Sequence, residues 1–98
     1  MDPDPAIGRE QTGRRPAVIV AGEDYLDTVD TLALIVPVTS IERRWPNHVP
    51  VYGLSRPSWA MTEQLRAVSR DRLHDRLGRV DDVTFQRIRH WLRDHLNL

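Results

Sequence analysis

The sequence contains no cysteine, no lysine and no long hydrophobic run. Without cysteine it has no disulfide framework, no thiolate nucleophile and none of the usual ligands of a zinc cluster. The longest apolar run, residues 32–38, has the length of a β-strand and is far shorter than the ~18 residues that a membrane span needs. The first residues are acidic and rich in proline, the reverse of a secretory signal, so we expect a cytoplasmic location and no membrane partner.

The charged residues balance, with 14 basic and 14 acidic side chains in 98 residues. A net charge of zero argues against a strong unspecific polyanion binder, whose affinity rests on neutralising phosphates, but it leaves room for a local basic site. Every basic side chain is arginine, whose planar fork suits phosphate. The base composition of the coding DNA explains this bias more simply. The length fits one domain, residues 1–98, with a single small core.

Short runs rich in β-branched residues predict a mainly β domain. Residues 1–14 show no apolar period and are expected to form a flexible loop. Residues 15–68 are expected to form a small closed barrel, with strands at 16–21, 31–41, 48–52, 58–61 and 64–68. Pro37 must lie where no ladder donor is needed, at an edge or a bulge.

The remaining residues, 69–98, are predicted to form a helical tail of two helices. The first would run over residues 69–77, with Ser69 as its N-cap and Gly78 as its stop. The second would run over residues 82–96, where apolar side chains recur at i, i+3 and i+4 and form a stripe that packs on the barrel. The fold class is therefore mainly β with appended helices, an α+β arrangement.

The four histidines do not predict a metal site. They stand at positions 48, 74, 90 and 95, and none of these spacings places two ligands on one helix face. We expect solvent-exposed histidines, no metal and no cofactor. Asp81 and Asp82 are interpreted as a helix-start pair, since carboxylates favour the positive end of a helix.

Two short polar segments are the better candidates for chemistry. Arg14 and Arg15 precede Pro16 at the start of the first predicted strand, and an arginine held by a following proline is pre-oriented. Thr39 and Ser40 stand where the long apolar strand turns polar. Their hydroxyls either donate to a phosphate or cap the strand end, and periodicity alone leaves both readings open.

Four motifs in order give the chain a family resemblance. Residues 4–20 (DPAIGREQTGRRPAVIV) resemble the MazF/PemK pattern DP-x-x-G-x-E-Q-x-x-x-RP-x-V-V-V. Residues 35–40 (IVPVTS) resemble its strand ending V-P-[LIV]-T-S, and residues 56–66 (RPSWAMTEQLR) resemble R-x-S-x-[AV]-x-x-x-Q-[LIV]-R. Residues 72–80 (RLHDRLGRV) and the following helix are similar to the family's usual tail.

This resemblance implies an SH3-like barrel of the MazF/CcdB kind, a homodimer, and a toxin that cleaves single-stranded RNA without metal. A cognate antitoxin would neutralise it. By position, Arg15 and Thr39 correspond to the family's catalytic pair: the guanidinium would stabilise charge on the phosphorane and the hydroxyl would hold a phosphate oxygen. RNA-binding positions matched by the resemblance, or adjoining that pair, are Glu10, Gln11, Arg14, Ser40, Ser58, Glu63 and Gln64.

The chain departs from the family pattern at its start. Members normally carry a strand of the type R-G-[DE]-[VI]-[YW]-x-[VA]-[DN]-L before the DP dipeptide, and no such segment precedes residue 4. Loss of a central strand would open a barrel edge. Three explanations stay open: a truncated start, another segment in its place, or completion of the fold by a partner.

Two alternatives to the nuclease interpretation also stay open. One is a non-catalytic binding module, because gyrase poisons of the CcdB type share this barrel and cleave nothing. The other is a degenerate toxin kept for dimerisation or antitoxin binding. Trp45, just past the catalytic strand, is either a base-stacking residue or a core or interface tryptophan.

Overall fold

The computed structural model describes residues 6–10, 15–20, 32–69 and 72–96. Within these ranges, seven strands, one 3₁₀ turn and one α-helix are formed. In chain order they are β1 (Ala6–Glu10), β2 (Pro16–Ile19), β3 (Leu32–Thr39), β4 (His48–Val51), β5 (Ser58–Met61), η1 (Thr62–Gln64), β6 (Arg66–Ser69), β7 (Leu73–Arg79) and α2 (Asp82–Leu96).

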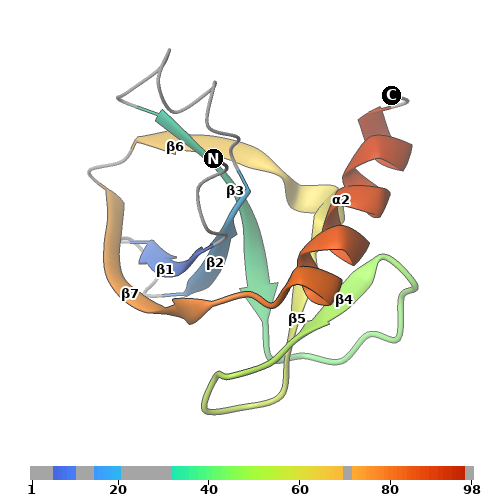
Figure 1. Cartoon of the computed structure of the whole chain (residues 1–98), viewed down its shortest axis with the longest axis horizontal. Helices are drawn as coiled ribbons and strands as arrows, with labels where there is room; N and C mark the ends of the chain where they lie inside the picture. Colours follow the sequence, from blue (N-terminus) through green and yellow to red (C-terminus); the bar gives the residue numbers. More distant parts are fainter. Residues whose placement is uncertain (1–5, 11–14, 21–31, 70–71, 97–98) are drawn as a thin grey trace.

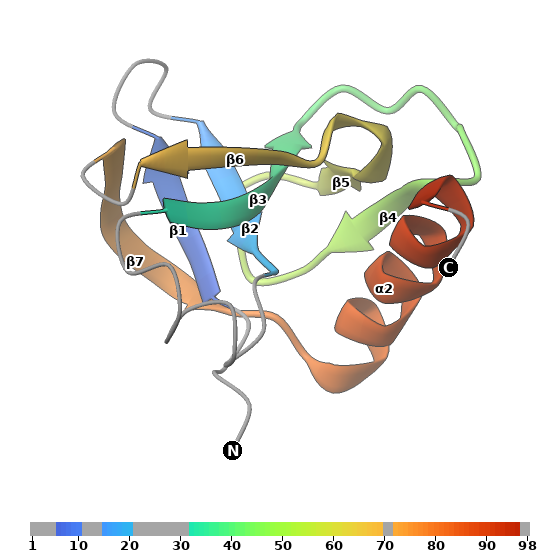
Figure 2. The same ribbon diagram turned by 90° about the horizontal axis from the view of Figure 1, so that it is seen from above.

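The strands form one strongly curved antiparallel sheet in the order β4-β5-β3-β2-β1-β7, with β6 paired to β3. Figure 1 shows β7, β1, β2, β3 and β6 curling around one side of the molecule, with α2 alongside β4 on the other side. From above, β6 crosses the curved wall of β1 and β2 (Figure 2). This half-barrel with a C-terminal helix confirms the expected mainly β class with an appended helix, but within the described residues β4 and β7 do not pair, so the sheet is not the closed barrel that the sequence predicts.

The long strand β3 connects the two halves of the sheet because it has three partners. It pairs with β2 over Ile35 to Pro37, with β6 up to Ile35, and with β5 from Val38 onward. Pro37 therefore faces the gap between its β6 and β5 partners, where a missing N–H costs no ladder bond. Ile35 and Val36 point to opposite faces and each is fully buried in a different hydrophobic cluster, as expected for a strand apolar on both faces.

Two predictions for the ends of the chain are wrong. Residues 6–10, assigned to a flexible loop, form β1, and the helix expected over residues 69–77 is replaced by the end of β6 and by β7. The helical tail is thus limited to α2, and the sheet extends beyond residue 68. Residues 1–5 and 11–14 of the expected loop lie outside the described residues. The cause is tertiary pairing, which overrides weak local propensity.

β1 and β7 stabilise each other across the length of the chain. Ala6 is opposite Arg79 and Glu10 is opposite Leu73, with an irregularity between Ile7 and Arg9. On its other side β1 pairs with β2, so residues 6–10 occupy the strand position next to β2.

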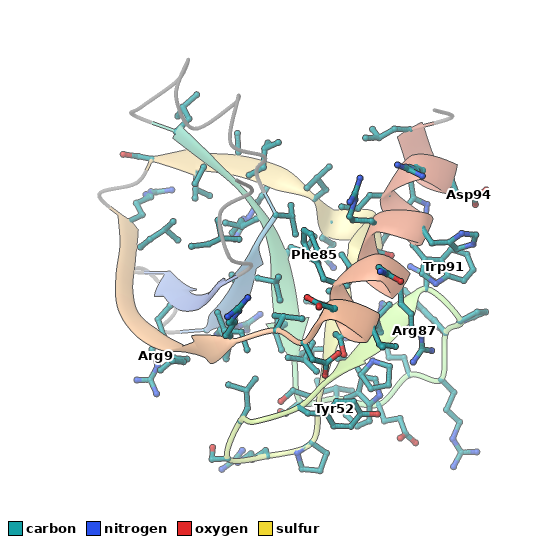
Figure 3. The ribbon with its side chains drawn as sticks, viewed as in Figure 1. Arg9, Tyr52, Phe85, Arg87, Trp91 and Asp94 are labelled. Atoms are coloured by element: carbon teal, nitrogen blue, oxygen red, sulfur yellow. The ribbon has the colours of Figure 1, made fainter. Side chains whose placement is uncertain are left out.

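The C-terminal helix α2 has the bounds that the sequence predicts. Asp81 caps it, accepting a 2.7 Å hydrogen bond from the backbone N–H of Thr84. That bond holds the pKa of Asp81 below its ordinary value of 3.8. Ile88 is fully buried in the main core, and Phe85 packs against the same cluster from the side of α2 that faces the sheet (Figure 3).

Candidate active site

A groove of about 710 Å³ lies where β2 begins, β3 ends and the β4–β5 connection turns back. Both residues that the sequence proposes as a catalytic pair, Arg15 and Thr39, line it. The described residues that line the groove are Arg9, Arg15, Pro16, Val38, Thr39, Ser40, Ile41, Arg43, Gly53, Leu54, Ser55, Arg56, Ser58, Met61, Gln64 and Leu77.

Arg15 is positioned by the residue that follows it. Pro16 is the first residue of β2 and is opposite Arg9 of β1, so the backbone at Arg15 is held at the start of a strand that is paired on both sides. Pro16 also restricts Arg15 to extended backbone conformations. The side chain is exposed and lines the groove. A rigid backbone and a solvent-facing guanidinium together suit a ligand with a phosphate group.

Thr39 is the last residue of β3 and is opposite Trp59 of β5. Its Oγ1 accepts a 3.1 Å hydrogen bond from the backbone N–H of Ile41. Because an oxygen lone pair is used in this bond, the hydroxyl hydrogen remains to donate to an acceptor in the groove. The Thr39 hydroxyl can therefore cap the strand end and donate to a ligand at the same time, two roles that the sequence left as alternatives.

The described lining of the groove is strongly cationic. It contains four arginines, at positions 9, 15, 43 and 56, and no aspartate or glutamate. Among the residues that the structure describes, Arg9, Arg15 and Arg56 make no ion pair with a carboxylate. In a chain of zero net charge this is a local concentration of positive charge, which attracts an anionic ligand.

One wall of the groove is held together by a methionine. Arg43 Nη1 lies 3.9 Å from Met61 Sδ, and Gln64 Nε2 lies 3.6 Å from the same sulfur. Across the groove, the β4–β5 connection turns at Gly53, whose φ of +90° other residues rarely adopt. Ser58 Oγ donates a 2.9 Å hydrogen bond to the carbonyl of Arg56 and so fixes the far end of that connection.

The structure brings together some of the proposed site residues and not others. Arg15, Thr39, Ser40, Ser58 and Gln64 line one groove. Gln11 and Arg14 lie outside the described residues, and the side chain of Glu10 does too, although its backbone belongs to β1.

Glu63 is described but is not among the residues that line the groove. Its carboxylate accepts hydrogen bonds from Asn47 Nδ2 at 2.8 Å and from His48 Nε2 at 3.1 Å. Burial alone would raise the pKa of Glu63, but these bonds and a backbone bond outweigh it and hold the pKa below 4.5. Glu63 therefore tethers the segment before β4 to η1.

The expectation of exposed histidines is wrong for His48. Its residue is 5% exposed, and its Nδ1 atom is buried with no hydrogen-bond partner. His48 begins β4, where the alternation of the strand turns its side chain inward toward Glu63. His90 and His95 are exposed, as expected, and the side chain of His74 is not described.

Sequence reasoning missed three arginines of the groove, Arg9, Arg43 and Arg56. For Arg56 a signal was present, because Arg56-Pro57 repeats the dipeptide Arg15-Pro16. Arg9 was hidden by the assignment of its segment to a loop. Arg43 follows a strand end with no periodic pattern to orient it.

Two features of the described residues bear on the kind of site. Nowhere in these ranges do three or more histidine, cysteine, aspartate or glutamate side chains gather as they would around a metal ion. The single described helix, α2, is neither long nor apolar enough to cross a bilayer.

The curved sheet and its arginine-lined groove define a small barrel-like protein with a cationic groove at the end of β3. A family model described as PemK-like, MazF-like toxin of type II toxin-antitoxin system matches residues 1–96. The chain therefore belongs to this toxin family, which confirms the resemblance found in its motifs.

Curated relatives agree with the family match. Endoribonuclease MazF9 of Mycobacterium tuberculosis is 34% identical over 107 residues, covering 100% of this chain and 91% of the relative. Endoribonuclease EndoA of Bacillus subtilis is 31% identical over 93 residues, covering 89% of this chain and 79% of the relative.

Solved structures show the same fold. A MazE-MazF structure from Deinococcus radiodurans (Form-I) matches with a TM-score of 0.81 at 24% identity, covering 100% of this chain and 99% of that chain. A mycobacterial endoribonuclease in complex with its cognate antitoxin matches with a TM-score of 0.78 at 22% identity, covering 98% of this chain and 96% of that chain.

Proposed function

We propose that this chain is an endoribonuclease toxin that cleaves single-stranded RNA in its arginine-lined groove and is neutralised by a cognate antitoxin. The observation that supports this most is the groove itself, where four arginines and no described carboxylate surround Thr39. Its curated relatives are named endoribonucleases, and the family is one of toxins with antitoxin partners. The site of action would be the cytoplasm, where RNA is available.

The reaction needs only the substrate's own nucleophile. The 2′-hydroxyl attacks the adjacent phosphorus, the bond to the 5′-oxygen breaks, and the products are a 2′,3′-cyclic phosphate and a 5′-hydroxyl. The proton lost by the 2′-hydroxyl is balanced by the one that the 5′-oxygen gains, so no co-reactant is consumed. The protein must stabilise the extra negative charge on the phosphorane.

Arg15 and Thr39 are the proposed catalytic pair. The Arg15 guanidinium donates two parallel N–H bonds to the non-bridging oxygens, a geometry that a lysine ammonium does not offer. The Thr39 hydroxyl, oriented by its bond from Ile41, donates to a phosphate oxygen. Because both groups act as hydrogen-bond donors, the mechanism assigns no role to a metal ion.

The remaining groove residues are proposed to hold the RNA. Ser40, Ser58 and Gln64 offer hydroxyl and amide groups to sugar, phosphate and base edges. Glu10, Gln11 and Arg14, on the segment before β2, are proposed for the same role. Glu63 is proposed to act indirectly, by holding the segment before β4 in place.

A homodimer that extends the groove across a two-fold axis is proposed, as the family resemblance implies. The antitoxin would act by covering the groove. A gyrase-poison-like or degenerate binding module is not favoured, because the curated relatives are named endoribonucleases and Arg15 and Thr39 line one groove.

The test compares variants of the purified protein on a pool of single-stranded RNA. Arg15→Ala is expected to slow cleavage by about 10²–10³-fold, the usual loss for one charge-stabilising donor. Arg15→Lys should recover only a small part of the rate, because it restores the charge without the fork. Arg87→Ala, which removes an exposed arginine of α2 outside the groove, is the matched control (Figure 3). Equal rates for wild type and Arg15→Ala would refute the proposal.

A further inference from the structure

Trp45 is an exposed aromatic side chain with no role in the site described above. It lies on the segment between β3 and β4, and 49% of it is accessible to solvent. It does not line the groove, and its exposure excludes a place in the core. The structure therefore has a half-exposed indole next to Arg43, which is one of the arginines that line the groove.

The Trp45 ring is held in place from one side. The indole contacts the ring of His48 at a centroid distance of 4.7 Å. The backbone carbonyl of Trp45 accepts a 3.0 Å hydrogen bond from the backbone N–H of His48. His48 is itself buried and bonded to Glu63. The indole is thus anchored to the start of β4, so that a ligand stacking on it would find it already oriented.

Arg43 joins this ring to the groove. Its guanidinium carbon lies 5.9 Å from the centroid of the Trp45 ring, while the same side chain lines the groove and contacts Met61. Between the two, Arg44 has a φ of +60°, a left-handed conformation that non-glycine residues rarely adopt.

We infer that Trp45 and Arg43 form a nucleobase site, in which a base of the substrate next to the scissile phosphate stacks on the indole beneath the guanidinium. Unpaired bases in RNA are commonly stacked on aromatic rings and on guanidinium planes. A base between two planes needs about 7 Å, twice the ~3.5 Å contact distance. The present 5.9 Å reaches that value if the exposed Arg43 side chain shifts by about 1 Å.

This arrangement predicts what the site does for the reaction. The N–H edge of Arg43 remains available to a phosphate in the groove while its face covers the base. Stacking is tolerant of sequence because every base has a π-face. Trp45 should therefore strengthen the binding of any single-stranded RNA and should not decide which sequence is cut. The inference rests on the proposed function, since its ligand is the same RNA strand.

The test measures the affinity of a random single-stranded 2′-O-methyl RNA 10-mer, which cannot be cleaved by 2′-hydroxyl attack. Trp45→Ala and Trp45→Leu are expected to weaken binding about tenfold, whereas Trp45→Phe, which keeps a ring, should stay within about threefold of wild type. Tyr52→Ala removes an aromatic side chain that is 67% exposed but does not line the groove, and it should bind like wild type (Figure 3).

Each other outcome overturns the inference. If Trp45→Ala binds as tightly as wild type, no base stacks there. If Trp45→Phe is as weak as Trp45→Ala, the indole only positions Arg43. If wild type neither binds this RNA nor cleaves unmodified RNA, the proposed function falls as well, so the two failures are distinguishable.

A second measurement on the wild-type protein does not depend on the variants' folding. A 10-mer carrying 5-iodouracil, irradiated in the complex, should cross-link to the peptide that contains Trp45. Cross-links confined to other peptides would contradict the inference.

Discussion

The groove's four arginines make a quantitative prediction about salt. For single-stranded nucleic acid, each neutralised phosphate contributes about 0.7 to the slope of log affinity against log salt concentration. If Arg9, Arg15, Arg43 and Arg56 each contact one phosphate, they contribute a slope of about −2.8. Binding should then weaken about 50-fold between 50 and 200 mM salt.

Removing one of these arginines should change the slope by one contact. Arg56→Ala is the best choice, because Arg56 lines the groove without being proposed for catalysis. The slope for this variant should be shallower by about 0.7, at about −2.1. Its affinity should then weaken about 20-fold over the same salt range, in place of about 50-fold.

The assay is the fluorescence anisotropy of a labelled 2′-O-methyl RNA 10-mer at four salt concentrations. Arg87→Ala, an equally exposed arginine on α2, should leave the slope at the wild-type value. If Arg56→Ala keeps the wild-type slope, or if Arg87→Ala lowers it as much, the groove is not where phosphates bind.

Two further predictions concern stability. Ile88→Ala should lower the free energy of unfolding by about 2–5 kcal/mol, because Ile88 is fully buried between α2 and the sheet. Val83 is 69% exposed, so Val83→Ala should change this free energy by less than about 0.5 kcal/mol. Both changes are measured by urea unfolding, and equal effects would contradict the packing of α2. The pKa of Glu63 is lowered in the folded protein, so its contribution to stability is present above pH 4.5 and is lost as the pH falls through the folded value. The stability difference between wild type and Glu63→Gln should therefore shrink as the pH falls below 4.5, and a difference that does not shrink there would show that the carboxylate's charge is not what stabilises the fold.

The sequence predicted elements whose signals are local. α2 was predicted with both of its bounds because the apolar period, the cap at Asp81 and the buried Ile88 all fall within one segment. β3 was predicted for the same reason, since its apolar run is buried on both faces.

The sequence did not predict β1 and β7, and the two errors have one cause. Neither strand has a clear alternation of its own, and each is stabilised by pairing with the other from the opposite end of the chain. Two residues also resemble helix boundaries: Ser69, which lies before β7, and Gly78, which lies within it. Such long-range pairing leaves no local mark on the residues.

The candidate site was predicted in part. The Arg-Pro dipeptide and the polar end of the long strand identified Arg15 and Thr39, which do share a groove. Periodicity could not orient Arg43 or reveal that His48 is buried beneath Trp45, because both depend on how the segment after β3 folds back. Glu63 matched a family motif, but its partners place it outside the groove lining.

The most direct test of the central claim is the chemistry of the cut ends. Single-stranded RNA is incubated with the purified protein in EDTA, and the product termini are identified by mass spectrometry. We expect 2′,3′-cyclic phosphate and 5′-hydroxyl ends, formed as fast in EDTA as without it. Uncut RNA, or products with 5′-phosphate and 3′-hydroxyl ends, would contradict attack by the 2′-hydroxyl in this groove.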